Sequence, residues 1–405
     1  MPAALKLSPG EAVAQRTITA YTLTPDQLHK SEGLHRTSVV LSLASTLFSL
    51  IVLAVLIAVR FGPRVQRVAE SISRNRLVQA IIFVPTLLLT LAVFELPLEI
   101  YGHHVSRVYG LSVQGWASWL GDWAKAELLV IIFATLCLWG LYTGIRKAPT
   151  RWWFYSWLVT LRIMAAMVFA APVIIDPLFN RFEPLANTSP ELTTQLRNLA
   201  HSAGLNIPES RIFLMHASDK VTTYNAYVTG FGATKRIVVW DTTARDLTIG
   251  QTLFVFGHEM GHYVLHHIYL GLAFTALLMF VGLYVLQHLA QAVLQRYGNA
   301  WHIRSLADWS SLPLLFLLAG VLSFFGDPLA NSFSRWEEHH ADMYGLAVTR
   351  PVTPDYAQVA AQAFQLLGQN SYSYPNPAPF LVFWDYSHPP IADRVRFALS
   401  SADRP

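Results

Sequence analysis

The residues most able to carry out chemistry lie in one stretch, FGHEMGHYVLHH, which holds four histidines and a glutamate within residues 256–267. On a helix, residues four apart share a face, so His258 and His262 can bind one metal ion. Glu259 then lies beside that metal rather than on it. This is the HExxH pattern, in which the carboxylate takes a proton from metal-bound water. The alternative, a helix end with surface histidines, is disfavoured because chance produces the pattern roughly 0.02 times in such a chain.

The third metal ligand is predicted in the segment RWEEHHAD. If this segment is helical, Glu338 and Asp342 share a face. Glu338 can then bind the metal, and Asp342 can accept the other ring N–H of a liganding histidine, which fixes the orientation of that ring. Glu337 is the competing ligand but lies off this face. His339 and His340 are weaker alternatives, which we expect to line the site or to face solvent.

Catalytic zinc sites use three protein ligands and leave one position open for water. We therefore expect one Zn²⁺ per chain, held by the two histidines and Glu338. We interpret His266 and His267 as interfacial, because a fourth protein ligand would close the open position. Zinc lowers the pKa of its water towards about 7 and polarises a peptide carbonyl. Glu259 would accept the water proton and deliver it to the leaving amine, so the predicted reaction is peptide-bond hydrolysis.

The composition places this chemistry in a membrane protein. Hydrophobic residues make up 53% of the 405 residues and charged residues only 13%, against about 25% charged in soluble proteins. The net charge of +4 is too small and scattered to indicate nucleic acid. The single cysteine, Cys137, excludes an internal disulfide and a thiolate metal site. Six stretches are apolar over the roughly 20 residues that a span needs: 39–59, 78–101, 125–145, 153–175, 268–290 and 312–331.

Several charged residues fall at or near membrane depth in these spans. Such residues normally face a bundle interior or a water-filled cavity, although some could lie at the headgroups. They are Glu95, Glu99, Lys125, Glu127, Arg162 and Asp327.

The chain divides into five predicted regions. They are a polar N-terminal segment (1–38), a four-helix transmembrane region (39–176), a zinc-peptidase region (177–266), two further transmembrane helices (267–333) and a C-terminal helical region (334–405). In the zinc-peptidase region we expect a helix from about 190 to 203, closed by Gly204. The β-rich runs RIFLMH, NAYVTGF and RIVVWD predict a small antiparallel sheet, and a helix through 249–266 carries HExxH.

These motifs together resemble the integral-membrane CAAX prenyl protease type 1 family of zinc metallopeptidases. The resemblance rests on HEMGH, on the E-x-x-A-D of Glu338 to Asp342 and on SHPP at 387–390, and it covers about residues 20 to 400. Four longer segments share it: LEIYGHHVSRVYGLS, DPLFNRFEPL, NAYVTGFGATKRIVVWDT and YSHPPIADRVRFAL. It implies a mainly α, polytopic membrane fold. About six transmembrane helices would surround a water-filled chamber, and the small antiparallel sheet and HExxH helix would form a gluzincin-like zinc domain.

The resemblance also implies roles for individual residues. Asn225 and Ala226 would pair an extended substrate with a sheet edge, where main-chain bonds supply affinity with little sequence preference. His388 would contact the substrate carbonyl or the transition-state oxyanion, and Arg394 would brace the active-site acids. Asp342 matches a position sometimes assigned as proton donor, whereas its helical spacing predicts a partner for a liganding histidine.

Departures from the family bear on the source and the substrate. Eukaryotic members have seven spans and this sequence has six, which suggests a bacterial member in the inner membrane. Most bacteria lack prenylated CAAX proteins, so the expected partners are the lipid bilayer and a peptide or protein substrate, lipidated or not. The alternatives are a quality-control protease of the heat-shock type and, less favoured, a metal transporter. The resemblance places the zinc domain in the cytoplasm, whereas the arginine-rich loops after the first and third spans favour the opposite orientation.

Overall fold

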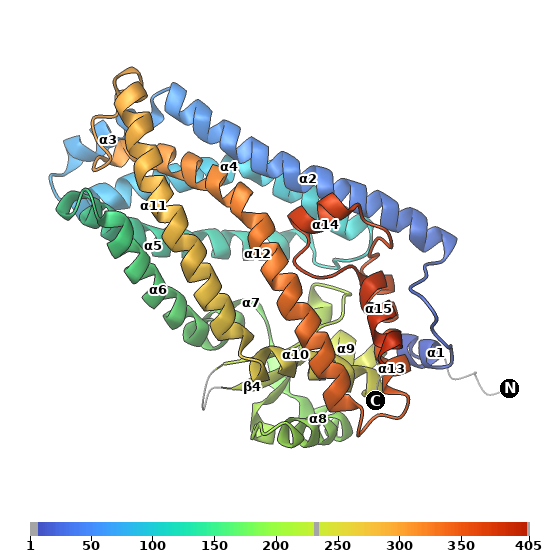
Figure 1. Cartoon of the computed structure of the whole chain (residues 1–405). Helices are drawn as coiled ribbons and strands as arrows, with labels where there is room; N and C mark the ends of the chain where they lie inside the picture. The colour runs from blue at the N-terminus through green and yellow to red at the C-terminus, as the bar shows by residue number, and fades with distance from the viewer. Residues whose placement is uncertain (1–6, 231–234, 403–405) are drawn as a thin grey trace.

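The longest elements of the structure are six helices that are long and apolar enough to cross a membrane (Figure 1). The computed structural model describes residues 7–230 and 235–402. Five of these helices are α2 (Pro25–Ala58), α4 (Arg76–Val108), α5 (Trp116–Lys147), α11 (His267–Trp301) and α12 (Leu312–Thr349). The sixth joins α6 (Trp152–Ala170), a π-turn (Ala171–Ile175) and α7 (Asp176–Phe179). The six predicted spans all fall on these helices, which confirms a polytopic, mainly α fold.

The spanning helices are longer than the sequence predicted. The last part of the polar segment before residue 39 belongs to α2, which begins at Pro25 behind a capping box made by Thr24 and Gln27. At the other end of the chain, α12 continues without a break from the sixth span to Thr349. The predicted boundary at 333 therefore lies inside one helix, and Glu338 is carried by the same rigid element as the span. The five-region division remains a prediction.

Two of the charged residues predicted in the spans, Glu95 and Lys125, contact neighbouring side chains or backbone. Ser49 Oγ of α2 donates a hydrogen bond of 2.6 Å to Glu95 Oε1 of α4, so this carboxylate faces a neighbouring helix. Lys125 pairs with Asp122 at 2.6 Å and donates to the carbonyl of Leu178 at 3.3 Å. These placements fit the expectation that such groups turn towards protein rather than lipid.

The polar part of the chain forms a four-stranded mixed sheet in the order β1-β2-β4-β3. Its strands are β1 (Phe182–Pro184), β2 (Ile212–Met215), β3 (Ala226–Thr229) and β4 (Arg236–Trp240). The prediction of an antiparallel sheet is wrong for the central pair, because β2 and β4 are parallel. The hairpin of β3 and β4 is antiparallel and places β4 against β2, which leaves β3 as an edge strand. The short β1 was not predicted, and Phe231 of the run NAYVTGF lies outside the described residues.

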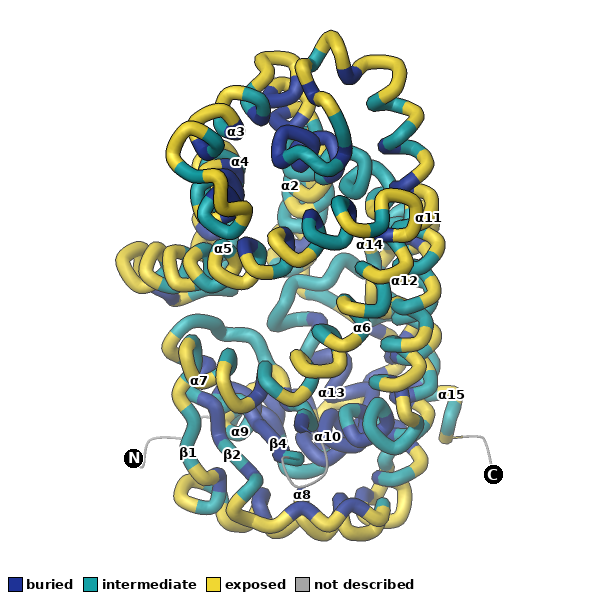
Figure 2. Tube along the Cα trace, turned by 90° about the vertical axis from the view of Figure 1, so that its left-hand side faces the viewer, coloured by how far each residue is buried: buried dark blue, intermediate teal, exposed yellow. Residues whose placement is uncertain are grey.

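Helices surround this sheet and bury it. They are α1 (Pro9–Ala14), α8 (Pro190–Ser202), α9 (Asp241–Asp246), α10 (Ile249–Val264), α13 (Tyr356–Asn370) and α15 (Ile391–Ser400). The short helix α14 (Pro379–Asp385) packs instead on the spanning helix α12. Gly204, at a φ of +76°, follows α8 in the left-handed conformation that glycine favours. One apolar core joins Leu196, Ile237, Phe254, Phe364 and Val395, and Figure 2 shows the buried residues gathered around α10, β4 and α13. Helix α10, which carries HExxH, thus runs through the best-packed part of the molecule.

A second core fixes the end of the bundle that lies away from α10. It joins Phe83, Leu87, Tyr142 and Trp309, and the hydroxyl of Tyr142 lies 2.7 Å from Ser311 Oγ. The short helix α3 (Phe61–Ile72) packs at this end. Short 3₁₀ turns complete the described structure: Leu185–Asn187, Glu209–Arg211, Ala217–Asp219 and Trp309–Ser311.

Candidate metal centre

The sequence of α10 lets a second helix approach its histidines closely. A Cβ at Gly257 would lie 2.9 Å from Val348 Cγ1, and one at Gly261 would lie 3.0 Å from Ala341 Cα. Gly345 of α12 faces α10 in the same way, because its Cβ would lie 2.9 Å from the backbone nitrogen of His258. The glycines in and beside the HExxH stretch therefore position α12, not only α10.

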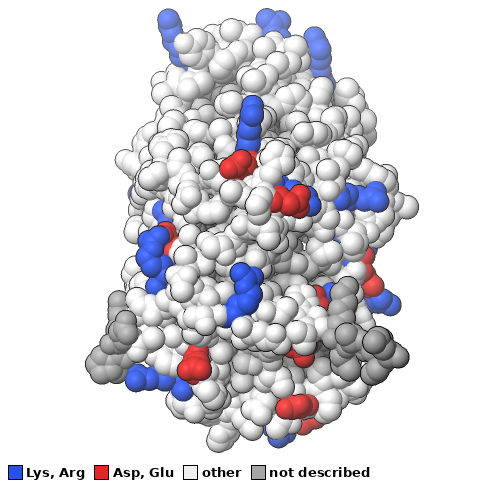
Figure 3. Space-filling view, turned by 90° about the vertical axis from the view of Figure 1, so that its right-hand side faces the viewer, with Lys and Arg blue, Asp and Glu red and all other residues white. Residues whose placement is uncertain are grey.

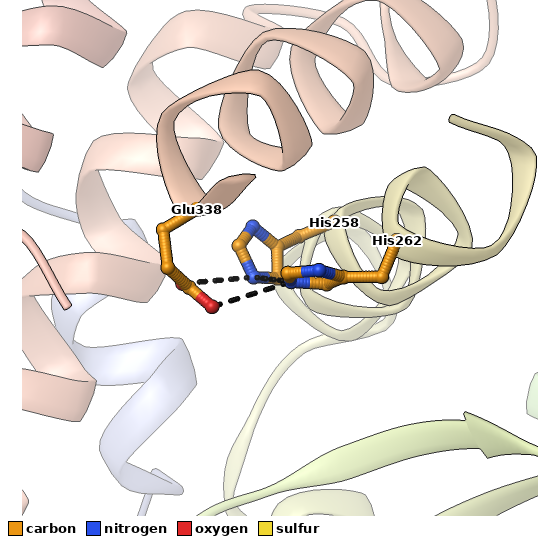
Figure 4. A group of neighbouring side chains, drawn as sticks. All are labelled: His258, His262 and Glu338. Atoms are coloured by element: carbon orange, nitrogen blue, oxygen red, sulfur yellow. Dashed lines mark hydrogen bonds and ion pairs between the residues drawn. The ribbon is translucent and has the colours of Figure 1, made fainter. Parts of the chain in front are cut away.

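This close packing brings Glu338 to the two histidines. His258 Nε2 and His262 Nε2 lie 3.3 Å apart. Glu338 Oε2 lies 3.4 Å from His258 Nε2, and Glu338 Oε1 lies 3.3 Å from His262 Nε2. Figure 4 shows the three side chains pointing at one another from α10 and α12.

The competing ligands lie elsewhere. The carboxylate of Glu337 points towards Gly271 of α11, where its Oε1 would lie 3.7 Å from an added Cβ. The ring of His339 packs on Phe397 with centroids 4.5 Å apart. His340 Nδ1 lies 2.8 Å from the carbonyl oxygen of Trp336. Among the described residues, only His258, His262 and Glu338 form a group that could hold a metal ion.

The three side chains fit a tetrahedral metal ion. Nitrogen and oxygen ligands roughly 2.0–2.1 Å from a tetrahedral zinc ion lie about 3.3 Å from one another, which matches the separation of the two histidine nitrogens and the distance from each of them to its nearer Glu338 oxygen. His258 Nδ1 is 2.8 Å from Asp342 Oδ1, so a neutral His258 donates there and turns the lone pair of Nε2 towards the other two acceptors. Glu338 Oε2 is buried and has no hydrogen-bond partner among the described residues. A cation at this point satisfies all three groups.

Asp342 and Arg394 hold His258 from behind. Arg394 donates from Nε to Asp342 Oδ2 at 2.9 Å and from its terminal nitrogen to Oδ1 at 2.6 Å. The same terminal nitrogen lies 3.7 Å from Glu338 Oε2. Burial acts to lower the pKa of His258, but its hydrogen bond to Asp342 and the nearby carboxylate of Glu338 outweigh burial and raise that pKa to about 9. These contacts place Asp342 behind the ligand ring and Arg394 beside both acids.

His267 is a neighbour of the site, although the sequence predicted an interfacial residue at this position. Its Nδ1 lies 3.1 Å from His262 Nδ1, and its side chain is buried rather than interfacial. His266 adopts a φ of 60° between α10 and α11, and this left-handed residue turns the chain so that His267 points back to His262. A non-glycine residue in that conformation gives no sequence signal. Because His262 Nε2 faces the other ligands, its Nδ1 carries the hydrogen and His267 accepts it.

Replacing His267 with Ala should lower the affinity for zinc by about 10- to 100-fold, because the ring of His262 loses the partner that orients it. His266→Asn is the matched control, since asparagine tolerates the left-handed conformation and the exposed His266 ring does not reach the ligands. Competition with a chromogenic zinc chelator measures both affinities. Equal affinities in the two variants would show that His267 is only a packing residue.

Glu259 follows His258 on α10 and is half-buried. Burial raises the pKa of its carboxyl, while the charges of His258 and His262 act to lower it. A carboxyl with a raised pKa takes up and returns a proton more readily near neutral pH. Glu259 is thus beside the ligands and chemically suited to proton transfer.

His388 lies at the open side of this cluster. Its Nε2 is 3.4 Å from Glu338 Oε1, and its Nδ1 is 2.9 Å from Ser387 Oγ. The side chain is 61% exposed, so it can meet a molecule that approaches the ligands.

A groove of about 610 Å³ leads away from this point and is lined by Asn225, His388 and Arg394. Two segments distant in the sequence complete its walls with His35 and Tyr374, whose rings stack 4.8 Å apart. No spacing rule brings these segments to the groove, so the sequence does not predict their place there.

The edge of the sheet begins at the same groove. The backbone nitrogen of Trp240 donates to Asn225 O at 3.1 Å, so in an antiparallel pair the backbone groups of Ala226 point to the free edge. There the amide of Ala226 donates to Asn225 Oδ1 at 2.8 Å. Asn225 thus lines the groove that adjoins the cluster, and the buried Ala226 follows it on β3.

Comparisons with known proteins identify the family. Residues 186–402 match the family model described as Peptidase family M48, and residues 14–181 match the one described as CAAX prenyl protease N-terminal, five membrane helices. The chain belongs to peptidase family M48. Four of the six long apolar helices lie within the N-terminal match, over the described residues 25–179.

Individual relatives agree with this assignment. The chain is 36% identical over 351 residues to a protein of Bacillus subtilis (strain 168) named "Uncharacterized metalloprotease YhfN", covering 87% of this chain and 80% of that protein. It is 25% identical over 398 residues to "CAAX prenyl protease 1" of Saccharomyces cerevisiae, covering 91% and 85%. The crystal structure of S. mikatae Ste24p has the same fold, with a TM-score of 0.77 at 24% identity over 96% of this chain and 92% of that one.

The M48 protein is therefore a multi-pass membrane metalloprotease, and its similarity to the B. subtilis protein supports a bacterial member. Membership of this peptidase family does not support the alternative function of a metal transporter.

Proposed function

We propose that this metalloprotease is a zinc endopeptidase whose ion is held by His258, His262 and Glu338. The proposal rests on two histidine nitrogens that lie 3.3 Å apart and each approach one oxygen of Glu338, at 3.4 and 3.3 Å. The Oε2 of that buried carboxylate has no hydrogen-bond partner among the described residues. When bound, zinc would lower the pKa of a water towards about 7 and polarise the scissile carbonyl.

The chain's own residues then move the proton. Glu259 accepts a proton from the attacking water as the new C–O bond forms, and returns it to the amine as the C–N bond breaks. His388 donates a hydrogen bond to the carbonyl oxygen as negative charge develops there. Asp342 and Arg394 keep the His258 ring in one tautomer and one orientation and take no part in the proton transfer.

We further propose that substrates bind as an added strand at the edge of β3. The backbone groups of Ala226, which point away from β4, would pair with the substrate main chain, after the side chain of Asn225 turns from the Ala226 amide to the incoming peptide. A strand antiparallel to β3 runs its C-terminal end past Asn225 into the groove beside His35 and Tyr374. Residues after the scissile bond therefore contact mainly polar and aromatic side chains, with Asp385 as the acidic residue of the groove.

The substrate class follows from main-chain recognition at a membrane. Peptides presented from the bilayer reach this edge whether or not they are prenylated, so the proposal covers C-terminal trimming of prenylated peptides and, as the alternative, degradation of damaged membrane proteins. Digestion of a farnesylated C-terminal peptide, compared with digestion of an unfolded membrane protein, separates these two substrates by their rates.

Treating the purified protein with a strong chelator should abolish peptide hydrolysis, and adding Zn²⁺ should restore it, because Glu259 alone cannot activate water at neutral pH. Elemental analysis should find about one zinc per chain in the active protein. Hydrolysis that persists in a metal-free preparation would overturn the proposal.

We also propose that the protein lies in the bacterial inner membrane with the metal centre in the cytoplasm. The orientation of the family supports this, while the arginines of the loops after α2 and α5 oppose it. Reporter fusions should show a cytoplasmic reporter at Pro405 and a periplasmic one after Ala69. Cytoplasmic activity of the reporter after Ala69 alone would reverse the orientation.

A further inference from the structure

The end of the molecule remote from the metal centre carries a basic surface that peptide hydrolysis does not use. Helix α3 begins after Arg60, whose φ of 59° ends the long helix α2. Figure 1 places α3 at the opposite end of the bundle from α10, and Figure 3 shows Lys and Arg side chains projecting from that end.

The exposed residues of α3 are basic near its beginning and apolar towards its end. Arg60, Arg64 and Arg67 are exposed at its beginning, and Val68 and Ile72 are 54% and 63% exposed towards its end. A short helix that follows a span and exposes both cations and large apolar side chains matches the boundary between headgroups and acyl chains.

The basic side chains surround a groove rather than a flat surface. The groove has a volume of about 380 Å³ and lies between α3 and the segment from His302 to Ser310. Arg60, Arg64, Arg67 and Arg304 line it, with Glu70 as the acidic residue among its lining.

Most of the positive charge in the groove is not neutralised. Arg60 Nε donates to the carbonyl of Ala300 at 3.2 Å, and Arg67 Nε donates to that of Pro63 at 3.4 Å. Within the described part of the chain, neither of these arginines nor Arg64 has a carboxylate partner. Arg304 differs, because Asp308 at 3.0 Å and Glu70 at 3.4 Å hold it in place.

The walls of the groove are fixed by close contacts. A Cβ at Gly62 would lie 2.8 Å from the carbonyl oxygen of Ser310, so α3 packs directly on the opposite wall. The buried side chain of Gln66 accepts a hydrogen bond from the Ser310 amide at 2.9 Å and donates one to Glu70 at 2.8 Å. The arginines therefore project from a rigid support, which lowers the entropy lost when they bind a ligand.

We propose that this groove binds the phosphate-bearing headgroup of an anionic phospholipid. Guanidinium groups match phosphate oxygens in geometry and charge, and basic clusters next to a span recognise anionic lipids. A lipid is favoured over a soluble anion because Val68 and Ile72 extend the same face with apolar contacts for the acyl chains.

The test uses the full-length protein in a neutral detergent and measures binding of short-chain phosphatidylglycerol, short-chain phosphatidylcholine and inorganic phosphate. Wild-type protein should bind phosphatidylglycerol at least tenfold more tightly than phosphatidylcholine. The double variant Arg64→Gln/Arg67→Gln should lose this preference, while Arg296→Gln, an exposed arginine of α11 outside the groove, should keep it.

Unchanged melting temperatures will show that the variants are folded. Equal binding of the two lipids by the wild type would overturn the proposal, as would a preference that survives in the double variant. Displacement of phosphatidylglycerol by inorganic phosphate at equal concentration would also overturn it, because the groove would then be a site for a soluble anion.

Discussion

Glu259→Gln should reduce the turnover number for peptide hydrolysis by about a thousandfold and leave the zinc content unchanged. The amide has nearly the same shape as the carboxylate but cannot accept the proton of the attacking water. The metal ligands are not altered, because Glu259 does not belong to the group formed by His258, His262 and Glu338. A thousandfold loss corresponds to about 4 kcal/mol of transition-state stabilisation.

Glu337→Gln is the matched control for this substitution. It makes the same chemical change at a partly buried glutamate whose carboxylate points to α11 rather than to the ligands. Mass spectrometry of peptide products, together with elemental analysis of both variants, measures turnover and zinc separately. If Glu259→Gln hydrolyses peptides as fast as Glu337→Gln does, the general base is another group.

The residues of the metal centre could be predicted because their spacing is a property of one helix turn. His258 and His262 must share a face in any helix, and so must Glu338 and Asp342. The structure also explains why the two helices meet, since Gly257, Gly261 and Gly345 leave no side chain between them. The sequence showed these glycines, but their function depends on the partner helix, which the sequence does not specify.

The parts of the site that could not be predicted depend on chain reversals. His267 reaches His262 only because His266 takes a left-handed conformation, and the pattern of apolar residues around 266 reads as the start of a span. The parallel pairing of β2 and β4 also depends on where the chain reverses between strands. Short β-rich runs predict strands, but their order depends on which run turns back on which.

The continuity of α12 has a consequence for how the site is held. Glu338 and Asp342 lie on the helix that also contains the sixth predicted span, so displacement of that span moves the proposed metal ligand Glu338 directly. His267 similarly begins α11, the other spanning helix next to the site. The membrane helices therefore form part of the metal centre's support.

Arg394→Met should lower the free energy of unfolding by about 3 kcal/mol, because it leaves the Asp342 carboxylate buried without its cation. The side chain of Asp342 is 1% exposed and that of Arg394 is 10% exposed, so water cannot replace the guanidinium. The guanidinium also lies 4.4 Å from the ring centroid of Phe364, and methionine keeps part of this packing. The loss measured is therefore mainly that of the charge pair.

Arg396→Met on the same helix provides the control. Its ion pair with Asp393 is exposed on both sides, and such pairs contribute about 0–1 kcal/mol. Thermal unfolding in detergent, with and without zinc, should show a large loss of stability for Arg394→Met alone. In the double variant Asp342→Asn/Arg394→Met the two losses should be less than additive, because the amide no longer needs a cation. Additive losses would mean that Arg394 acts through a group other than Asp342.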